Sequence, residues 1–376
     1  MNHLSPSMKR VAHFIDTGVP GGAEVLLIEI CKRLQDYNFQ PEVYHFGNWW
    51  LEKKCNELNI PIFIVPGHKY YKSIKTLPIF NLMFYRFIRQ RKIDILHSHL
   101  FGPITGSCVA TFLNRTPHIG TIHDTYTIDE KKTRIQMLRW ASILGTKLVT
   151  VASTMQEYLQ KIGNLKDGVI ETVYNGVQIN PFQTSGNSSL RKSLDLNDDD
   201  FVFICVGRLI GIKRHDFLIE AFNRLKPIDL VKLLIVGEGP ERKKIEAMII
   251  QKDLHKNVKL LGFRDDIAEL LKISDCFLLA STTEGLSCSI AEAMAAGLPL
   301  VVTDVGGNKE LVEDDRCGYI VPVNDLNLFA EKMQYLINNK EKRILFGTRS
   351  ALIVKEKFSM DRMIGKYVDI YQRMTK

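Results

Sequence analysis

Short apolar runs alternate with helical patterns through most of this 376-residue chain, and this alternation limits the fold more than any other feature. The runs Phe201–Val206 and Asp275–Ser281 are continuous, as in strands that are buried on both faces of a parallel sheet. After the first run, His215–Leu225 has the spacing of a helix with one apolar face. Repeated strand and helix patterns indicate βαβ units, so the chain is predicted to have an α/β fold with parallel sheets.

The length and one break in the pattern indicate two domains. Domains have about 100 to 200 residues each, so a chain of 376 residues suits two. Asn175-Gly176 marks a turn, and the stretch Gln178–Asp200 after it is polar and poor in strand patterns. The predicted domains are residues 1–175 and 176–357, followed by a terminal helix at 358–376. That helix is amphipathic, and its apolar side carries Met360, Met363, Ile364, Tyr367 and Tyr371.

Two glutamates with seven residues between them follow the second apolar run. Glu284 lies just beyond the carboxyl end of the strand, where ligands bind in open α/β sheets. Gly285 lets the backbone approach a ligand closely, and Ser287 or Ser289 is suited to cap the helix that carries Glu292. Glu292 can accept hydrogen bonds from a diol such as a ribose. The alternative is a capping box, in which Glu292 bonds back to the backbone of Ser289.

Two cations lie in the glycine-containing loop after the first apolar run. Arg208 follows Gly207, and Lys213 comes shortly after Gly211, just before the predicted helix. A guanidinium offers a planar fork for two phosphate oxygens and an ammonium offers a compact charge, so the pair is suited to clamp a diphosphate. The alternative is that both are solvated surface residues.

Taken in order, these residues resemble the donor half of family 4 of the retaining glycosyltransferases. The resemblance covers roughly Phe201–Val323 and rests on Gly207-Arg208 with Lys213, Leu234–Pro240, Leu261–Phe263, the two glutamates, Ala293–Pro299 and Gly306–Glu310. It implies the GT-B fold, with two Rossmann-like βαβ domains facing across a cleft. Residues 1–175 would bind the acceptor, residues 176–357 would bind the nucleotide sugar, and the terminal helix would cross back to the first domain.

The amino half resembles the same family more loosely. Pro20-Gly21-Gly22-Ala23-Glu24 follows a strand pattern at Val11–Ile15, and in the family this glycine loop lies over the donor phosphates and the acceptor. His123, after the strand pattern His118–Ile122, matches the family's active-site histidine. His97 and His99 end another strand pattern, and they either face the cleft or are packed residues with one hydrogen bond each.

The resemblance implies a role for each site residue. His123, Glu284, Arg208 and Lys213 would be catalytic, and substrate would be bound by Gly21, Gly22, Arg208, Lys213, Gly285, Leu286, Ser287 and Glu292. The two cations would stabilise the negative charge on a leaving diphosphate. Glu284 would hold sugar hydroxyls, Glu292 the ribose, and His123 would orient the sugar or the acceptor. The acceptor would attack the sugar on the same face as the leaving phosphate, and the phosphate would take the proton of the acceptor.

The resemblance further implies a UDP-sugar donor and a glycan or lipid-linked oligosaccharide acceptor in surface polysaccharide biosynthesis. Three other classes stay open. A retaining glycosidase also uses two carboxylates but needs no diphosphate clamp. A GT-B phosphorylase or sugar-nucleotide epimerase turns over the donor without a glycan acceptor. A catalytically silent binding module would make no product.

Neither a metal nor a cofactor is expected. Asp198-Asp-Asp200 has the spacing of a metal-binding motif, but it precedes a strand rather than following one, so it is predicted to be a charged turn. Gly237-Glu-Gly239 begins like a dinucleotide fingerprint, but Arg242 occupies the third glycine position, which argues against a nicotinamide enzyme. No nucleic-acid recognition motif accompanies the net charge of +8.

Part of the positive charge lies among aromatic residues within 68–92, in His68–Lys75 and Phe80–Lys92. This surface is suited to an anionic membrane or a lipid diphosphate, and the alternative is a core helix with a basic outer face. Lys131–Arg134 would add to the same surface if it lies nearby. The sequence has no signal peptide pattern, no apolar run of about 18 residues and no Cys-x-x-Cys pair. The protein is therefore expected to be cytoplasmic, either free or peripherally bound to the inner face of the membrane.

Overall fold

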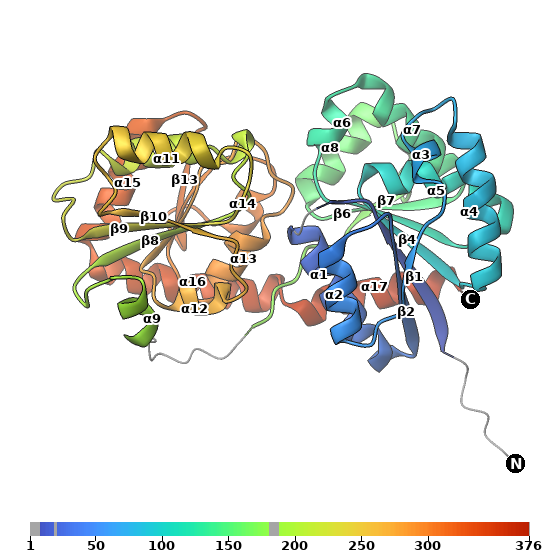
Figure 1. The fold of residues 1–376 in the computed structure, drawn as a ribbon, viewed down its shortest axis with the longest axis horizontal. Coiled ribbons are helices and arrows are strands. Elements are labelled where there is room, and N and C mark those ends of the chain that lie inside the picture. The colour runs from blue at the N-terminus through green and yellow to red at the C-terminus, as the bar shows by residue number, and fades with distance from the viewer. Residues whose placement is uncertain (1–7, 19–20, 180–187, 376) are drawn as a thin grey trace, which may run out of the picture. The chain divides into compact units, whose positions relative to one another are not determined.

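The computed structural model describes residues 8–18, 21–179 and 188–375. Two compact units make up the chain, each an α/β unit with its own parallel sheet (Figure 1). The first unit runs up to Asn175 and resumes at Asp361, and the second comprises Gly176–Met360.

The first unit contains a seven-stranded parallel sheet in the order β3-β2-β1-β4-β5-β6-β7. The strands are β1 (Lys9–Ile15), β2 (Phe39–His45), β3 (Ile62–Ile64), β4 (Ile95–His99), β5 (His118–Ile122), β6 (Thr146–Thr150) and β7 (Ile170–Thr172). The helices are α1 (Gly22–Leu34), α2 (Trp49–Glu57), α3 (His68–Tyr71), α4 (Leu77–Arg91), α5 (Phe101–Asn114), α6 (Tyr126–Asp129), α7 (Lys132–Ile143), α8 (Ser153–Gly163) and α17 (Met360–Met374), with a 3-10 turn at Gln35–Tyr37. The strand order reverses between β1 and β4, the position at which doubly wound folds bind ligands.

The second unit contains a six-stranded parallel sheet in the order β10-β9-β8-β11-β12-β13. The strands are β8 (Phe201–Val206), β9 (Val231–Val236), β10 (Val258–Gly262), β11 (Cys276–Leu279), β12 (Leu300–Thr303) and β13 (Gly318–Val321). The helices are α9 (Ser188–Ser193), α10 (His215–Phe222), α11 (Arg242–Gln251), α12 (Ile267–Lys272), α13 (Cys288–Ala295), α14 (Asn308–Leu311), α15 (Leu326–Asn338) and α16 (Lys340–Lys357), with a 3-10 turn at Gly211–Lys213. Here the order reverses between β8 and β11.

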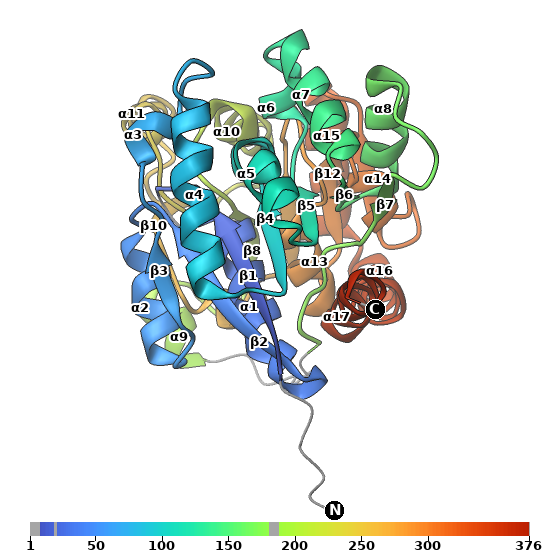
Figure 2. The ribbon, with the colours of Figure 1, turned by 90° about the vertical axis from the view of Figure 1, so that its right-hand side faces the viewer.

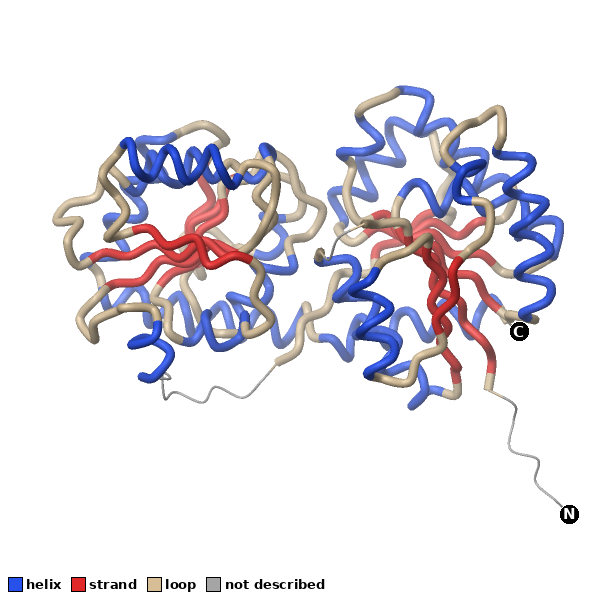
Figure 3. Tube along the Cα trace, viewed as in Figure 1, coloured by secondary structure: helices blue, strands red, loops and turns tan. Residues whose placement is uncertain are grey.

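Helices cover both faces of each sheet, which explains the continuous apolar runs in the central strands (Figure 3). All four residues of β11 are buried, as are the central residues of β8. The predicted α/β fold with parallel sheets is confirmed. The helix predicted at His215–Leu225 ends earlier, at Phe222, because the chain turns there while the Leu225 side chain stays in the core.

The terminal helix α17 packs on the first unit through the apolar side that the sequence indicates. Met363, Ile364, Tyr367 and Tyr371 are buried there, and Met360, at which the second unit ends, is buried as well. The hydroxyl of Tyr371 lies 2.7 Å from Nδ1 of His97 on β4, and Lys9 of β1 donates to the Thr375 hydroxyl at 2.7 Å. The end of the chain therefore completes the core of the first unit.

Candidate active site

In the second unit, the loops after β8, β9 and β10 pack against one another at the carboxyl edge of the sheet. The Leu209 amide donates to the Glu238 carbonyl at 2.9 Å, and the Gly237 amide donates to the Gly262 carbonyl at 2.8 Å. Gly237 has a φ of +140°, and a Cβ there would lie 2.0 Å from the Gly207 carbonyl oxygen. The Gly237–Gly239 motif therefore serves close packing of these loops.

Lys213 and Glu284 meet at this edge, although 71 positions separate them in the chain. Nζ of Lys213 lies 2.5 Å from Oε1 of Glu284, and the Ser281 hydroxyl donates to the same oxygen at 2.6 Å. The Thr282 amide donates to the Ile212 carbonyl at 2.8 Å, which holds the two loops together. Within the described residues, Oε2 of Glu284 has no hydrogen-bond partner. One carboxylate oxygen is therefore available to a ligand.

Arg208 differs from Lys213 in its surroundings. Its side chain is exposed, and it makes no ion pair or side-chain hydrogen bond with any residue that the structure describes. The two cations predicted to form a clamp thus differ, because Lys213 is neutralised by Glu284 and Arg208 is not. An unpaired guanidinium keeps its full charge and fork geometry for an anionic ligand.

The loop after β12 fixes the position of the Glu284 loop. The Gly307 amide donates to the Gly285 carbonyl at 2.7 Å, and the Thr303 hydroxyl donates to the Ser281 carbonyl at 2.6 Å. Gly306 has a φ of +50°, and a Cβ there would lie 1.9 Å from the Glu284 carbonyl oxygen. Only glycine fits this position without moving the carboxylate loop.

The residues after Glu284 begin α13. Ser287 is its N-cap, and its hydroxyl accepts a hydrogen bond from the Ile290 amide at 3.4 Å. The capping-box alternative for Glu292 is wrong, because the cap is Ser287 and the Glu292 carboxylate makes no hydrogen bond to the described residues. The Leu286 side chain is buried, so Leu286 would reach a ligand only through its backbone.

Glu292 is a half-buried carboxylate on α13. Burial raises its pKa to about 7, because removal from water disfavours the charged form. A partly desolvated carboxylate without a protein partner gains hydrogen bonds when a ligand brings hydroxyl donors to it. This arrangement suits the predicted contact with a diol.

His215, the first residue of α10, was missed by the sequence reasoning. It is buried, neither ring nitrogen has a hydrogen-bond partner within the described residues, and its pKa is lowered to about 4, mainly by burial and also by the charge of Lys213. Its position directly after Lys213-Arg214 was the available signal. A neutral imidazole at this place adds no charge to the cation loop.

In the first unit, His123 follows β5 at the carboxyl edge and lies at the end of a row of imidazoles. Its Nε2 lies 3.2 Å from Nδ1 of His99, and Nε2 of His99 lies 3.1 Å from Nδ1 of His13. Burial lowers the pKa of His123 to about 4 and that of His13 to about 3. His99 and His97 are buried, as the packed-residue interpretation holds, but each contacts two side chains rather than one. His97 contacts Tyr371 and Thr121, and His99 contacts His13 and His123.

Nitrogens of His13, His97 and His99 lie within 4.8 Å of one another, which raises the question of a metal site. The rings of His97 and His99 are stacked, with their centres 4.1 Å apart and their planes inclined by 29°, and stacked rings do not direct their in-plane lone pairs at one metal ion. Both nitrogens of His97 already contact hydroxyls, those of Tyr371 and Thr121, at 2.7 Å each. The geometry favours hydrogen bonding over metal coordination.

The predicted glycine loop lies at the start of α1. Gly21 is the N-cap, with no side chain to bond the amides of the first turn, and Gly22 is the first helical residue. Pro20 lies outside the described residues. In the second unit, Asp198-Asp-Asp200 precedes β8 at the amino edge of the sheet, and the Asp200 carboxylate accepts from the Asn197 amide at 2.7 Å. Asp200 thus closes a turn at the edge opposite the Lys213–Glu284 pair.

The basic segment 68–92 forms α3 and α4, and α4 packs beside α5 (Figure 2). One face of α4 is core, with Phe80, Phe84 and Ile88 buried, as the core-helix interpretation holds. Arg91 is not free, because its guanidinium lies 3.4 Å from the centre of the Phe63 ring and 3.4 Å from a carboxylate oxygen of Glu42.

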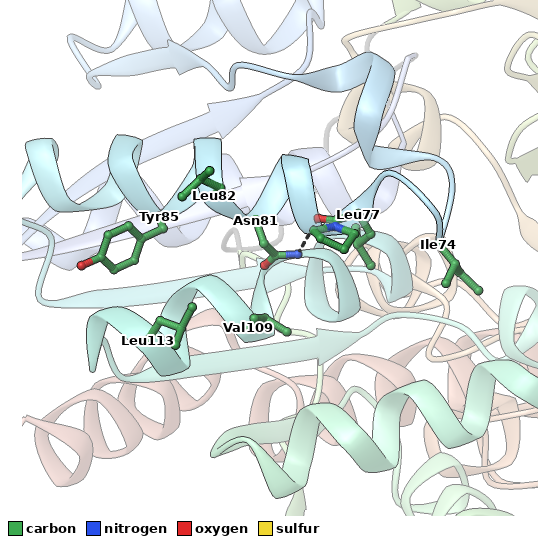
Figure 4. Close-up of a pocket in the computed structure, with 8 residues that line it drawn as sticks. Ile74, Leu77, Asn81, Leu82, Tyr85, Val109 and Leu113 are labelled. Atoms are coloured by element: carbon green, nitrogen blue, oxygen red, sulfur yellow. Dashed lines mark hydrogen bonds between the residues drawn. The ribbon is translucent and has the colours of Figure 1, made fainter.

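The outer side of α4 forms an apolar groove with α5, with a volume of about 630 Å³ (Figure 4). Its lining comprises Ile74, Leu77, Pro78, Asn81, Leu82, Tyr85, Val109 and Leu113. Leu82 and Leu113 are 54% and 62% exposed, and Arg89 donates to the Tyr85 hydroxyl at 3.0 Å, which places a cation beside the groove. None of the helices described is long and apolar enough to cross a membrane.

Comparisons with known proteins agree with this geometry. Residues 20–180 match the model of Glycosyltransferase Family 4, and residues 187–351 match that of Glycosyl transferases group 1. N-acetyl-alpha-D-glucosaminyl L-malate synthase of Bacillus anthracis is 27% identical over 93% of each chain. UDP-Gal:alpha-D-GlcNAc-diphosphoundecaprenol alpha-1,3-galactosyltransferase of Escherichia coli is 27% identical, over 80% of this chain and 79% of that protein. Alpha-monoglucosyldiacylglycerol synthase of Acholeplasma laidlawii is 28% identical over the same shares.

Among solved structures, Anabaena Alr3699/HepE in complex with UDP and glucose superimposes with a TM-score of 0.86, at 22% identity over 97% of this chain and 100% of that one. The two family models together match most of the chain, and their order agrees with the order of the two units. The chain therefore belongs to family 4 of the glycosyltransferases, and its two Rossmann-like units have the GT-B fold.

Proposed function

We propose that the protein transfers a hexose from a UDP-sugar, with retention of configuration and without an obligatory metal, to a lipid-linked or glycan acceptor in surface polysaccharide biosynthesis. The observation that carries the proposal is the carboxyl edge of the second sheet. There, the Lys213–Glu284 pair lies in the same pair of loops as the exposed Arg208, which has no ion-pair partner among the described residues. The cations at this edge suit the diphosphate of a nucleotide sugar, and the carboxylate suits the hydroxyls of its sugar.

The leaving diphosphate gains negative charge as the anomeric bond breaks. Arg208 is suited to bind it with two parallel hydrogen bonds, and Lys213 adds a second positive charge. Fixed hydrogen-bond donors that face the developing charge usually make the largest contribution to lowering the barrier of the reaction. These side chains are therefore proposed to take the role that a metal ion has in other glycosyltransferases.

Glu284 is proposed to hold donor-sugar hydroxyls rather than to attack the sugar. Its Oε1 already accepts from an ammonium and a hydroxyl, which lowers its nucleophilicity, and Oε2 is left to accept from the sugar. This supports attack of the acceptor on the same face as the leaving phosphate, with that phosphate taking the acceptor proton. Glu292 is proposed to bind the ribose diol, with Gly285 and the backbone of Leu286 next to the donor.

In the first unit, His123 is proposed to orient the sugar or the acceptor. The Gly21-Gly22 turn is proposed to contact the phosphates. Relatives support the acceptor class, because the names of two of them include a diphosphoundecaprenol and a diacylglycerol. The groove between α4 and α5 supports a lipid acceptor or membrane contact, since apolar chains fit an apolar lining beside a cation. We therefore propose that the protein acts at the cytoplasmic face of a membrane.

Product formation tests the reaction. The protein is incubated with UDP-glucose, UDP-galactose or UDP-N-acetylglucosamine and a diphosphoundecaprenol-linked sugar, and products are identified by mass spectrometry and proton NMR. We expect one donor to give an α-linked product at an unchanged rate in EDTA. Donor turnover without acceptor would instead indicate a phosphorylase or epimerase, and nucleotide binding without turnover would indicate a silent module. A β-linked product would contradict retention.

Vesicle co-sedimentation tests the membrane contact. We expect the protein to bind vesicles of anionic phospholipid and the double variant L82E/L113E to bind about tenfold less, because both leucines lie in the groove. Ile250→Glu changes an exposed apolar residue of the second unit, 73% exposed on α11, and serves as the control. Equal binding of both variants would contradict a role of the groove.

A further inference from the structure

Three imidazoles of the first unit form a continuous hydrogen-bonded row that runs from the core to the carboxyl edge of the sheet. His13 on β1 contacts His99 on β4 through Nδ1 and Nε2 at 3.1 Å. His99 contacts His123 through Nδ1 and Nε2 at 3.2 Å. Each link joins a donor to an acceptor, so the tautomer of one ring determines the tautomers of the other two.

The row ends differently on its two sides. Nε2 of His13 is buried and has no hydrogen-bond partner within the described residues. Nδ1 of His123 also has no partner there, but His123 is only half-buried and lies at the end of β5. The inner end is therefore closed, whereas the outer end is open to a ligand.

The closed end selects one of the two possible directions of hydrogen bonding. If the hydrogens pointed inward, His13 would carry an Nε2–H that is buried without an acceptor. If they point outward, His13 has a lone pair there instead. Buried N–H groups without an acceptor are rarer in proteins than acceptors without a donor, so the outward direction is favoured. Burial lowers the pKa of His13 to about 3 and that of His99 well below its usual value, which keeps both rings neutral.

We propose that His13 and His99 are positioning residues that hold His123 in its Nδ1–H tautomer. His13 donates to His99, His99 donates to Nε2 of His123, and Nδ1–H of His123 points outward as a donor. Within the proposed transfer reaction, on which this role rests, His123 gives a hydrogen bond to a substrate oxygen and does not accept a proton through that nitrogen. Proton removal from the acceptor is then left to the leaving phosphate.

The tautomer is measured directly by long-range proton–nitrogen correlation NMR of the full-length protein labelled with ¹⁵N-histidine, without substrate. The His123 signals are assigned by their absence in His123→Asn. We expect a protonated Nδ1 and an unprotonated Nε2 on His123. In His99→Phe and His13→Phe we expect a mixture of tautomers, because the donor to His123 is lost or no longer fixed.

Two further variants separate positioning from folding. His99→Asn places an amide donor where Nδ1 lies, so we expect it to keep the Nδ1–H form of His123, whereas His99→Phe lowers kcat about tenfold at an unchanged KM. His118→Asn removes another buried histidine, which bonds Thr146 and Ser98 outside the row, and we expect no change in the His123 tautomer. An Nε2–H tautomer of His123 in the wild type would overturn the proposal. A His123 tautomer that is the same in the wild type and in both phenylalanine variants would overturn it as well. Because the NMR measurement needs no substrate, failure of the transfer reaction would be a separate result.

Discussion

The carboxyl edges of the two sheets have the same strand topology, but the first carries neutral side chains and the second carries charged ones. Both sheets reverse strand order beside their first strand, and both present loops there. The edge of the first unit carries neutral imidazoles such as His99 and His123, whose pKa values are lowered by burial. The edge of the second carries the Lys213–Glu284 ion pair and the exposed Arg208. The fold supplies the edge, and the few residues after each strand decide which ligand charge it accepts.

The largest expected effect comes from breaking the charged pair. Lys213→Met leaves the Glu284 carboxylate, 10% exposed, without its counter-ion, so we expect the unfolding free energy to fall by about 3 kcal/mol and kcat by about 10²- to 10³-fold. The double variant K213M/E284Q should recover stability but not activity. Urea denaturation and initial rates measure both.

A matched pair in the first unit gives the control. Lys147 and Glu171 lie 3.1 Å apart with side chains 23% and 30% exposed, and Glu171 also pairs with Arg373 at 2.9 Å, so Lys147→Met should cost less than about 1 kcal/mol. Equal costs for both lysine variants would show that the pair at the second edge is an ordinary surface ion pair.

A smaller effect is expected from the loop that holds Glu284. Gly306→Ala introduces a Cβ 1.9 Å from the Glu284 carbonyl oxygen at a φ of +50°, so we expect a loss of about 2 kcal/mol and about tenfold in kcat. Gly211→Ala, in the cation loop, has open space around its Cβ and should change neither quantity by much. Thermal unfolding and steady-state kinetics compare the two variants, and a fully active Gly306→Ala would mean that the loop position is not critical.

The effect expected at Glu292 concerns stability alone and depends on pH. Its pKa is raised by burial from 4.5 to about 7, so the folded state binds this proton more tightly than the unfolded state. The stabilisation is fully present below pH 4.5 and is lost as the pH rises through about 7. Relative to Glu292→Gln, the wild type should lose on the order of 3 kcal/mol across this window, as measured by urea denaturation. Parallel pH profiles of the two proteins would contradict the raised pKa.

The sequence predicted the strands and loops of the second unit well because the signals are local there. Apolar runs gave β8 and β11, and the residues directly after them gave Arg208, Lys213 and Glu284. Two features had no local signal. The contact of Gly306 with the Glu284 loop depends on β11 and β12 being neighbours, and the contact of His13 with His99 depends on β1 and β4 being neighbours. Within its strand, His13 has the pattern of an ordinary packed residue.

Isothermal titration calorimetry with UDP tests most directly whether the second unit binds a diphosphate. We expect UDP to bind the wild type and to bind Arg208→Gln at least about tenfold more weakly, because a charge-assisted bidentate contact is lost. Lys243→Gln, which removes the same charge from an exposed position on α11, should match the wild type. Unchanged UDP affinity in Arg208→Gln, or equal loss in both variants, would contradict the account.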